Sequence, residues 1–277
     1  MRISVKELKK PEQVLYAFAL GDALSYYMTS KNLNDDEITA QWSALDPLGF
    51  SNRTFLLFST WIGLKAISRE MIFESISAER FRVELTEYSC KFLHSFQKTS
   101  NFRDASLDTW DAIEQMHKHF LAHSSFSNFK LKPKITSTDP AKDTSVCLAR
   151  ILPLFVYGLD TKMPSALDFK KFIDLTHISP DAYLFLEDLK TYLTNGRFKR
   201  SFPWLRERIH PDLGVAIQSL KNSRTPLEAF LKSQRSGLRN KSTGALTLAL
   251  WVWKNGWSEE LEEQTLAMPN PPYELET

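Results

Sequence analysis

Signals that begin and end helices recur along the whole chain, and they constrain the fold more than any other feature of the sequence. The clearest predicted helix begins at the capping residue Ser179, which is followed by a proline and an acid. It ends at Asn195-Gly196, a pair typical of helix C-termini. Another segment opens at Ser77 and carries large apolar residues at spacings of three and four. These residues are Phe81, Leu85, Tyr88, Phe92 and Phe96.

Further segments show the same helical punctuation and periodicity. They cover residues 13–28, 51–67, 106–120, 145–157, 166–175, 226–232 and 243–254, with a last helix capped by Ser258. No stretch shows strand alternation bounded by hairpin turns, and the 9 glycines are few for a turn-rich β architecture. We therefore expect an all-α fold, as a single compact domain of about ten to twelve helices over residues 1–277.

Three segments lack helical patterning and are expected to be loops: Asn32 to Gly49, Ser124 to Asp143 and Thr194 to Pro203. The first contains the acidic cluster Asp35-Asp36-Glu37. Because no second carboxylate cluster accompanies it, we interpret its members as solvated loop or helix-cap residues rather than as metal ligands.

The sequence predicts neither an export signal nor a membrane span. Residues 1–10 hold four basic residues and no apolar run, so no signal peptide is predicted. The apolar stretches are shorter than the roughly 20 residues that span a bilayer. Two cysteines, Cys90 and Cys147, give neither a disulfide framework nor metal-binding spacing. We expect a soluble, cytoplasmic protein with reduced thiols and no membrane partner.

Charge is unevenly distributed, although the net charge is only +2. The basic segment, Lys190 to Lys241, has twelve basic and three acidic residues and thus a surplus of +9. The acidic tail, residues 258–277, has six glutamates and no base. A basic segment can attract a phosphate-bearing ligand, nucleic acid or an acidic partner. Alternatively, the tail folds back on it, or both are solvated helix faces.

Three histidines, His117, His119 and His123, form an H-x-H-x3-H cluster. Positions two apart on a helix point about 200° from each other, so His117 and His119 cannot share a metal ion. We interpret all three as surface or cap residues and predict no metal site here. The phosphate-loop, dinucleotide-binding, zinc-protease and nucleophile-elbow motifs are also absent.

Four segments follow one another in the order of a known series of motifs. They are Ala17-Phe-Ala-Leu-Gly-Asp-Ala-Leu24, Phe50-Ser-Asn-Arg-Thr-Phe-Leu-Leu57, Thr144-Ser-Val-Cys-Leu-Ala-Arg-Ile-Leu-Pro-Leu154 and Leu175-Thr-His-Ile-Ser-Pro-Asp-Ala182. Together with residues 243–268 they resemble the ADP-ribosylglycohydrolases, whose motifs read G-D-A-L-G, T-D-D-T, G-N-G-x-x-M-R-x-x-P-L and T-H-x-x-P-x-A. The resemblance covers about residues 11–270 and implies an all-α domain with a two-magnesium site.

The resemblance also places the metal ligands of the family on this chain, and none of the carboxylates is present. The T-D-D-T turn and the ligating glutamate fall on Ser51, Asn52, Arg53, Thr54 and Thr29, and the final G-G-D-x-D-T motif is missing. Carboxylates supply the charge that holds magnesium. Arg53 instead repels a cation by about 4 kcal/mol per unit charge at about 4 Å in an effective dielectric of about 20. We predict that the magnesium site is lost and that no cofactor is bound.

The ligand cleft of the family corresponds to further positions of this chain. They are Asp22, Thr144, Ser145, Arg150 and His177. Thr144, Ser145 and a valine replace the glycines that let backbone N–H groups approach a diphosphate. Arg150 matches the family, but it also suits a structural role beside a buried acid or a helix C-terminus. His177 suits both the cleft and a turn before the next helix.

Three functions fit these observations. The favoured one is a non-catalytic protein that binds a protein partner, for instance as an immunity protein against an ADP-ribosylating toxin, or that binds an ADP-ribosyl group. The alternative is an active hydrolase that cleaves ADP-ribose or a related glycosidic bond without metal, with Asp22 or Asp35 to Glu37 as its carboxylate. In the third, the basic segment and its interleaved aromatics, Phe198, Phe202 and Trp204, bind nucleic acid, although such aromatics more often belong to a core.

Overall fold

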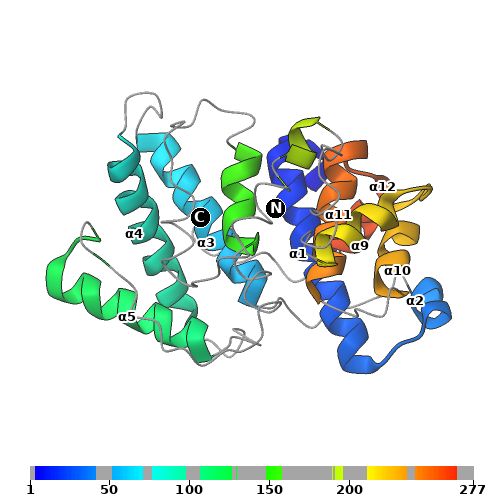
Figure 1. Ribbon diagram of the computed structural model, residues 1–277, viewed down its shortest axis with the longest axis horizontal. Coiled ribbons are helices and arrows are strands. Elements are labelled where there is room, and N and C mark those ends of the chain that lie inside the picture. Colours follow the sequence, from blue (N-terminus) through cyan, green and yellow to red (C-terminus); the bar gives the residue numbers. More distant parts are fainter. Residues whose placement is uncertain are drawn as a thin grey trace, which may run out of the picture. The chain divides into compact units, whose positions relative to one another are not determined.

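The structure is a computed structural model, and it describes residues 4–41, 52–70, 77–97, 107–126, 129, 148–157, 189, 191–195, 211–235 and 241–266. Within these ranges every regular element is a helix and no strand occurs (Figure 1). The predicted all-α class is therefore confirmed for this part of the chain. The predicted number of helices includes segments outside it. None of the described helices is both long and apolar enough to span a membrane.

The chain divides into two compact units. The first unit comprises Met1–Ser51 and Glu187–Glu274, and the second comprises Asn52–Leu186 and Leu275–Thr277. Each unit is described by itself below, and the single domain expected over residues 1–277 stays a prediction.

The first unit is built around two helices that pack against each other, α1 (Lys10–Lys31) and α11 (Lys241–Asn255). Residues 14–25 of α1 are all buried, which makes it a central helix, since a surface helix buries only one stripe. The elements around this pair are the 3-10 helix η1 (Val5–Glu7) and the helices α2 (Asp35–Gln41), α9 (Pro211–Leu220), α10 (Pro226–Arg235) and α12 (Glu259–Leu266).

Two glycines allow α1 and α11 to approach closely. A Cβ atom on Gly21 would lie 2.5 Å from the carbonyl oxygen of Gly244 and 2.7 Å from the Cα of Ala245. A Cβ atom on Gly244 would collide with the hydroxyl of Ser25. The glycine of the G-D-A-L segment is therefore used here for helix packing.

The second unit contains α3 (Asn52–Glu70), α4 (Ala78–Gln97), α5 (Leu107–His123) and the helical residues 148–157. Helix α4 packs against both α3 and α5. Large aromatic side chains fill the interior, among them Phe58, Phe81 and Phe126. Trp61 of α3 is also buried, and its indole nitrogen donates a hydrogen bond of 2.7 Å to the hydroxyl of Tyr157.

Most helix ends agree with the sequence analysis. The hydroxyl of Ser77 accepts a hydrogen bond from the backbone N–H of Arg80 at the start of α4, and the hydroxyl of Ser258 accepts one from Leu261 at the start of α12. The segments predicted over 13–28, 226–232 and 243–254 are helical in α1, α10 and α11, and so are the described residues of the segments 51–67 and 106–120, in α3 and α5. The predicted helix 166–175 lies outside the described residues, and residues 189 and 191–195 of the helix predicted after Ser179 are helical.

Two short helices correct the sequence analysis. The segment expected as a loop from Asn32 contains α2, and Asp35, Asp36 and Glu37 are its first turn. The side chain of Asn34 accepts a hydrogen bond from the N–H of Glu37 (2.9 Å), and the carboxylate of Glu37 accepts one from the N–H of Asn34 (2.8 Å). This reciprocal capping box begins the helix. Helix α9 was not predicted either, although its first residue is a proline, Pro211.

Candidate functional site

A polar stripe runs along α1 in the segment that carries the family resemblance. Asp22, Ser25 and Thr29 follow one another at spacings of three and four and therefore share one side of the helix. Asp22 and Ser25 are both 0% exposed, whereas Thr29 is exposed. The hydroxyl of Thr29 donates a 2.7 Å hydrogen bond to the carbonyl oxygen of Ser25. The side chain that stands at the family's ligating glutamate is thus bonded to its own helix.

Ser25 belongs to a buried polar cluster that the sequence analysis missed. The amide nitrogen of Gln234 in α10 lies 3.5 Å from the hydroxyl of Ser25 and 3.3 Å from that of Ser233. In the same unit, the hydroxyl of Thr243 in α11 donates to the carboxylate of Asp212 in α9 at 3.1 Å. All five side chains are buried. Hydrogen-bonded groups in a low-dielectric interior fix the packing of the helices that carry them, which gives the cluster a structural use.

The T-D-D-T-like positions lie at the start of α3 in the second unit. Asn52 is the first residue of the helix, Arg53 is half-buried and Thr54 is fully buried. Ser51 lies outside the described residues. The first turn of α3 contains no acidic residue. Arg53 therefore adds its positive charge to the positive end of the helix dipole, and both disfavour a bound cation.

Arg150 lies within the core of the second unit. Its side chain is 0% exposed, and its positive charge acts on the thiol of Cys90 in α4. Burial raises the pKa of that thiol to about 11, and the nearby Arg150 guanidinium opposes the rise. The choice between a cleft role for Arg150 and a structural role beside an acid or a helix C-terminus stays a prediction. The other cleft candidates, Thr144, Ser145 and His177, lie outside the described residues.

The histidines of α5 contact different neighbours. The ring of His117 stacks on that of His94 in α4, with centroids 3.5 Å apart and planes 11° apart. The ring of His119 lies 4.6 Å from that of His123 and 5.1 Å from that of Phe129. Burial and the charge of His123 lower the pKa of His119. The prediction that His117 and His119 point apart is confirmed, while the stack on His94 was not predicted.

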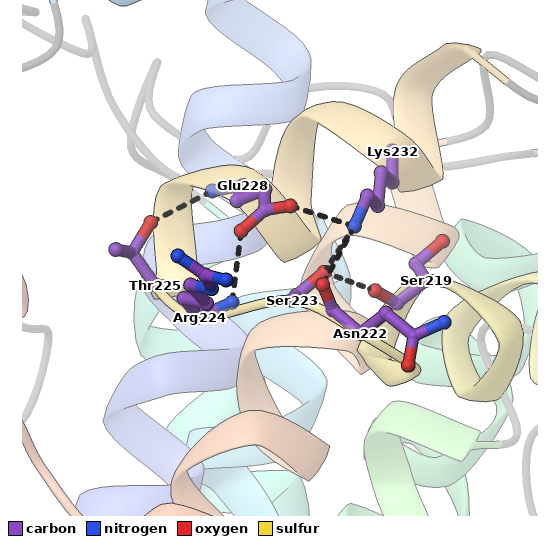
Figure 2. Close-up of polar contacts among 7 residues, drawn as sticks. All are labelled: Ser219, Asn222, Ser223, Arg224, Thr225, Glu228 and Lys232. Carbon is purple, nitrogen blue, oxygen red and sulfur yellow. Dashed lines mark hydrogen bonds and ion pairs between the residues drawn. The ribbon is translucent and has the colours of Figure 1, made fainter.

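Part of the basic segment is neutralised from within (Figure 2). The ammonium of Lys232 donates hydrogen bonds to the carbonyl oxygen of Asn222 (3.2 Å), the hydroxyl of Ser223 (3.1 Å) and the carboxylate of Glu228 (2.7 Å). Glu228 also accepts a 2.8 Å hydrogen bond from the backbone N–H of Arg224. The bond from Lys232 is the main cause that lowers the pKa of Glu228. These contacts stabilise the turn between α9 and α10, and the carboxylate of Glu228 pairs with the positive charge of Lys232.

The described part of the acidic tail contacts two different segments. The carboxylate of Glu262 accepts hydrogen bonds from the hydroxyl of Ser4 (2.6 Å) and from the backbone N–H groups of Val5 and Lys6 (both 3.2 Å). Burial raises the pKa of Glu260, and the backbone of Leu227 in α10 opposes the rise. Glu260 thus lies beside the backbone of the basic segment, whereas Glu262 holds the N-terminal segment, and a pairing of the tail with the basic side chains stays a prediction.

The described residues contain no group of three or more histidine, cysteine, aspartate or glutamate side chains that could hold a metal ion. The candidates fall in different units: Asp22 and Thr29 in the first, and Asn52 to Thr54 and Arg150 in the second. No family model, curated protein or solved structure matches the chain. The ADP-ribosylglycohydrolase-like fold is thus a prediction from the four motifs.

Proposed function

We propose that this chain is a non-catalytic relative of the ADP-ribosylglycohydrolases that acts by binding. Its partner would be a protein, such as an ADP-ribosylating toxin that it neutralises, or an ADP-ribosyl group. The observation that carries the proposal is the environment of Thr29, Arg53 and Asp22. The hydroxyl of Thr29 is bonded to its own helix. Arg53 places a cation in the first turn of α3, and the carboxylate of Asp22 is fully buried.

Metal-dependent removal of ADP-ribose requires carboxylates that hold the metal and face the substrate. Thr29 brings no charge, and its hydroxyl is engaged by the carbonyl oxygen of Ser25. Arg53 brings the opposite charge. Asp22, the one acid among the candidate positions, has no exposed surface. These properties support a scaffold that has kept the motif positions without the metal chemistry.

The metal-independent hydrolase gains no support from the acids on which it relies. Asp22 has no exposed surface. Glu37 uses its carboxylate to cap α2 through the N–H of Asn34. Glycosidic hydrolysis commonly uses two carboxyl groups that flank the scissile bond. Asp35, Asp36 and Glu37 lie on a single helical turn and therefore do not flank a substrate from two sides.

Isothermal titration with ADP-ribose tests the binding proposal. We would titrate the full chain once in EDTA and once in millimolar magnesium, and we expect the same result in both. Saturable binding in both would identify the ADP-ribosyl group as the ligand, and its absence in both would point to a protein partner, to be tested with an ADP-ribosyltransferase domain. Binding that requires magnesium would contradict the proposal, because it would demand a functional metal site.

A matched pair of variants on α3 makes the titration more specific. Arg53→Gln removes the cation from the first turn, and Arg69→Gln removes an exposed one from the last turn. If the ligand carries phosphates, Arg53→Gln should weaken binding by about tenfold, as expected for the loss of one charge-assisted contact. Arg69→Gln should leave the affinity unchanged. Thermal unfolding of both variants controls for loss of the fold.

A further inference from the structure

Two histidines lie one above the other at the end of α5. His119 and His123 are four residues apart, so their side chains share one side of the helix. His123 is exposed and His119 is half-buried against Phe126 and Phe129. The pair is distinct from the stacked rings of His94 and His117 on the α4 side.

The separation of the two rings suits a shared metal ion. Metal–nitrogen bonds of about 2.0–2.1 Å with an angle of about 90–110° between them place the centres of two imidazoles about 4.5–5.2 Å apart. The rings of His119 and His123 have centroids 4.6 Å apart, with planes tilted by 48°. This spacing corresponds to two adjacent coordination positions on one ion.

The surroundings of His119 also suit a ligand. The backbone of Ser125 lies beside the ring of His119 and opposes the lowering of its pKa, as a carbonyl oxygen facing a ring N–H does. Metal-binding histidines commonly donate their second nitrogen in this way, which fixes the tautomer and the orientation of the ring. The pKa of His119 is lowered by burial and by His123, which favours the neutral imidazole that a metal requires. The site also lies at the C-terminal end of α5, where the helix dipole favours a cation.

Contrary to the expectation from the sequence, which excluded only a pairing of His117 with His119, we propose that His119 and His123 form a binding site for a divalent transition-metal ion. The described residues contribute no third histidine, cysteine or carboxylate to it, so the proposal assigns two protein ligands to the ion. Imidazole donors favour Cu²⁺, Ni²⁺ and Zn²⁺ over Mg²⁺, with Cu²⁺ bound most tightly. The site is independent of the function proposed above, since it lies on α5 and uses none of the motif residues.

Titration of the full chain with Cu²⁺ and with Ni²⁺ tests the site, by calorimetry in a buffer that does not coordinate metals. His123→Gln is the principal variant because its side chain is exposed and its replacement should not disturb the core. His119→Gln tests the second ligand, and His117→Gln is the matched control on the same helix. Circular dichroism with and without metal follows the stability of α5 in each variant.

We expect one site per chain whose dissociation constant rises by at least about tenfold in His123→Gln and in His119→Gln. In His117→Gln the affinity should stay within about twofold of the unaltered chain, since the ring of His117 stacks on His94 of α4 and not on the proposed pair. Affinity that is unchanged in His123→Gln would overturn the proposal. So would the absence of saturable binding by Cu²⁺, or a loss of affinity confined to His117→Gln.

Discussion

Replacing Gly21 by alanine tests whether the G-D-A-L segment acts as a helix-packing site. The three atoms nearest to the added methyl group would all be backbone atoms of α11, namely the carbonyl oxygen of Gly244 at 2.5 Å and the Cα and N of Ala245 at 2.7 and 2.9 Å. Backbone atoms of a helix cannot rotate away as a side chain can. The variant must therefore move α1 and α11 apart.

The magnitude follows from two opposing effects. Overpacking a well-packed interior costs about 1–3 kcal/mol, and a contact with backbone atoms places Gly21→Ala at the upper end of this range. Alanine in a helix interior is favoured over glycine by about 1 kcal/mol. We therefore expect the free energy of unfolding to fall by about 2 kcal/mol. With a denaturant slope of about 3 kcal/mol per molar urea, the midpoint falls by about 0.7 M.

Urea unfolding followed by circular dichroism gives the measurement. Gly63→Ala is the matched control, because its methyl group would meet the terminal Cδ1 of Leu85 at 2.7 Å, and this side chain can change its rotamer. We expect the control to lose clearly less stability than Gly21→Ala. A Gly21→Ala variant as stable as the unaltered chain, or less affected than the control, would refute the packing argument.

Three further predictions concern single side chains. The pKa of Glu228 is lowered below 4.5, chiefly by Lys232. Its carboxylate therefore stabilises the fold fully above pH 4.5, and this stabilisation is lost as the pH falls through the lowered pKa. In acid, the free energy of unfolding of Glu228→Gln should therefore fall less steeply with pH than that of the unaltered chain. Because the pKa of Cys90 is about 11, only about one thiol in a thousand is ionised at pH 8, and peptide-level mass spectrometry should find slow iodoacetamide labelling that becomes fast in urea. Glu262→Gln weakens charged hydrogen bonds to residues 4–6 and should cost about 1–3 kcal/mol in urea unfolding; an unchanged midpoint would contradict this.

The long helices could be predicted because their signals are local. The run of apolar residues in α4 and the caps at Ser77 and Ser258 lie within a few residues of the turns that they specify. Helices α2 and α9 were missed although α10 and α12 are equally short, so length alone is not the reason. Their start signals, the Asn34–Glu37 capping box and Pro211, are present in the sequence, but asparagine, aspartate and proline are also common in turns and therefore do not by themselves distinguish a helix from a loop.

The identities of the candidate residues could be read from the sequence, but their environments could not. Nothing local indicates that Asp22 is fully buried or that Thr29 turns back onto Ser25. The contact between Ser25 and Gln234 joins residues 209 positions apart, and such pairs depend on how helices pack. The same holds for the stack of His94 on His117, which required the pairing of α4 with α5.

The most direct test of a non-catalytic function is the release of ADP-ribose from an ADP-ribosylated protein in millimolar magnesium, measured by chromatography. We predict no release above that of a heat-inactivated sample, because the proposed relationship to the ADP-ribosylglycohydrolases assigns Thr29 and Arg53 to positions where the metal needs carboxylates. Release that exceeds this control and disappears in EDTA would contradict the prediction.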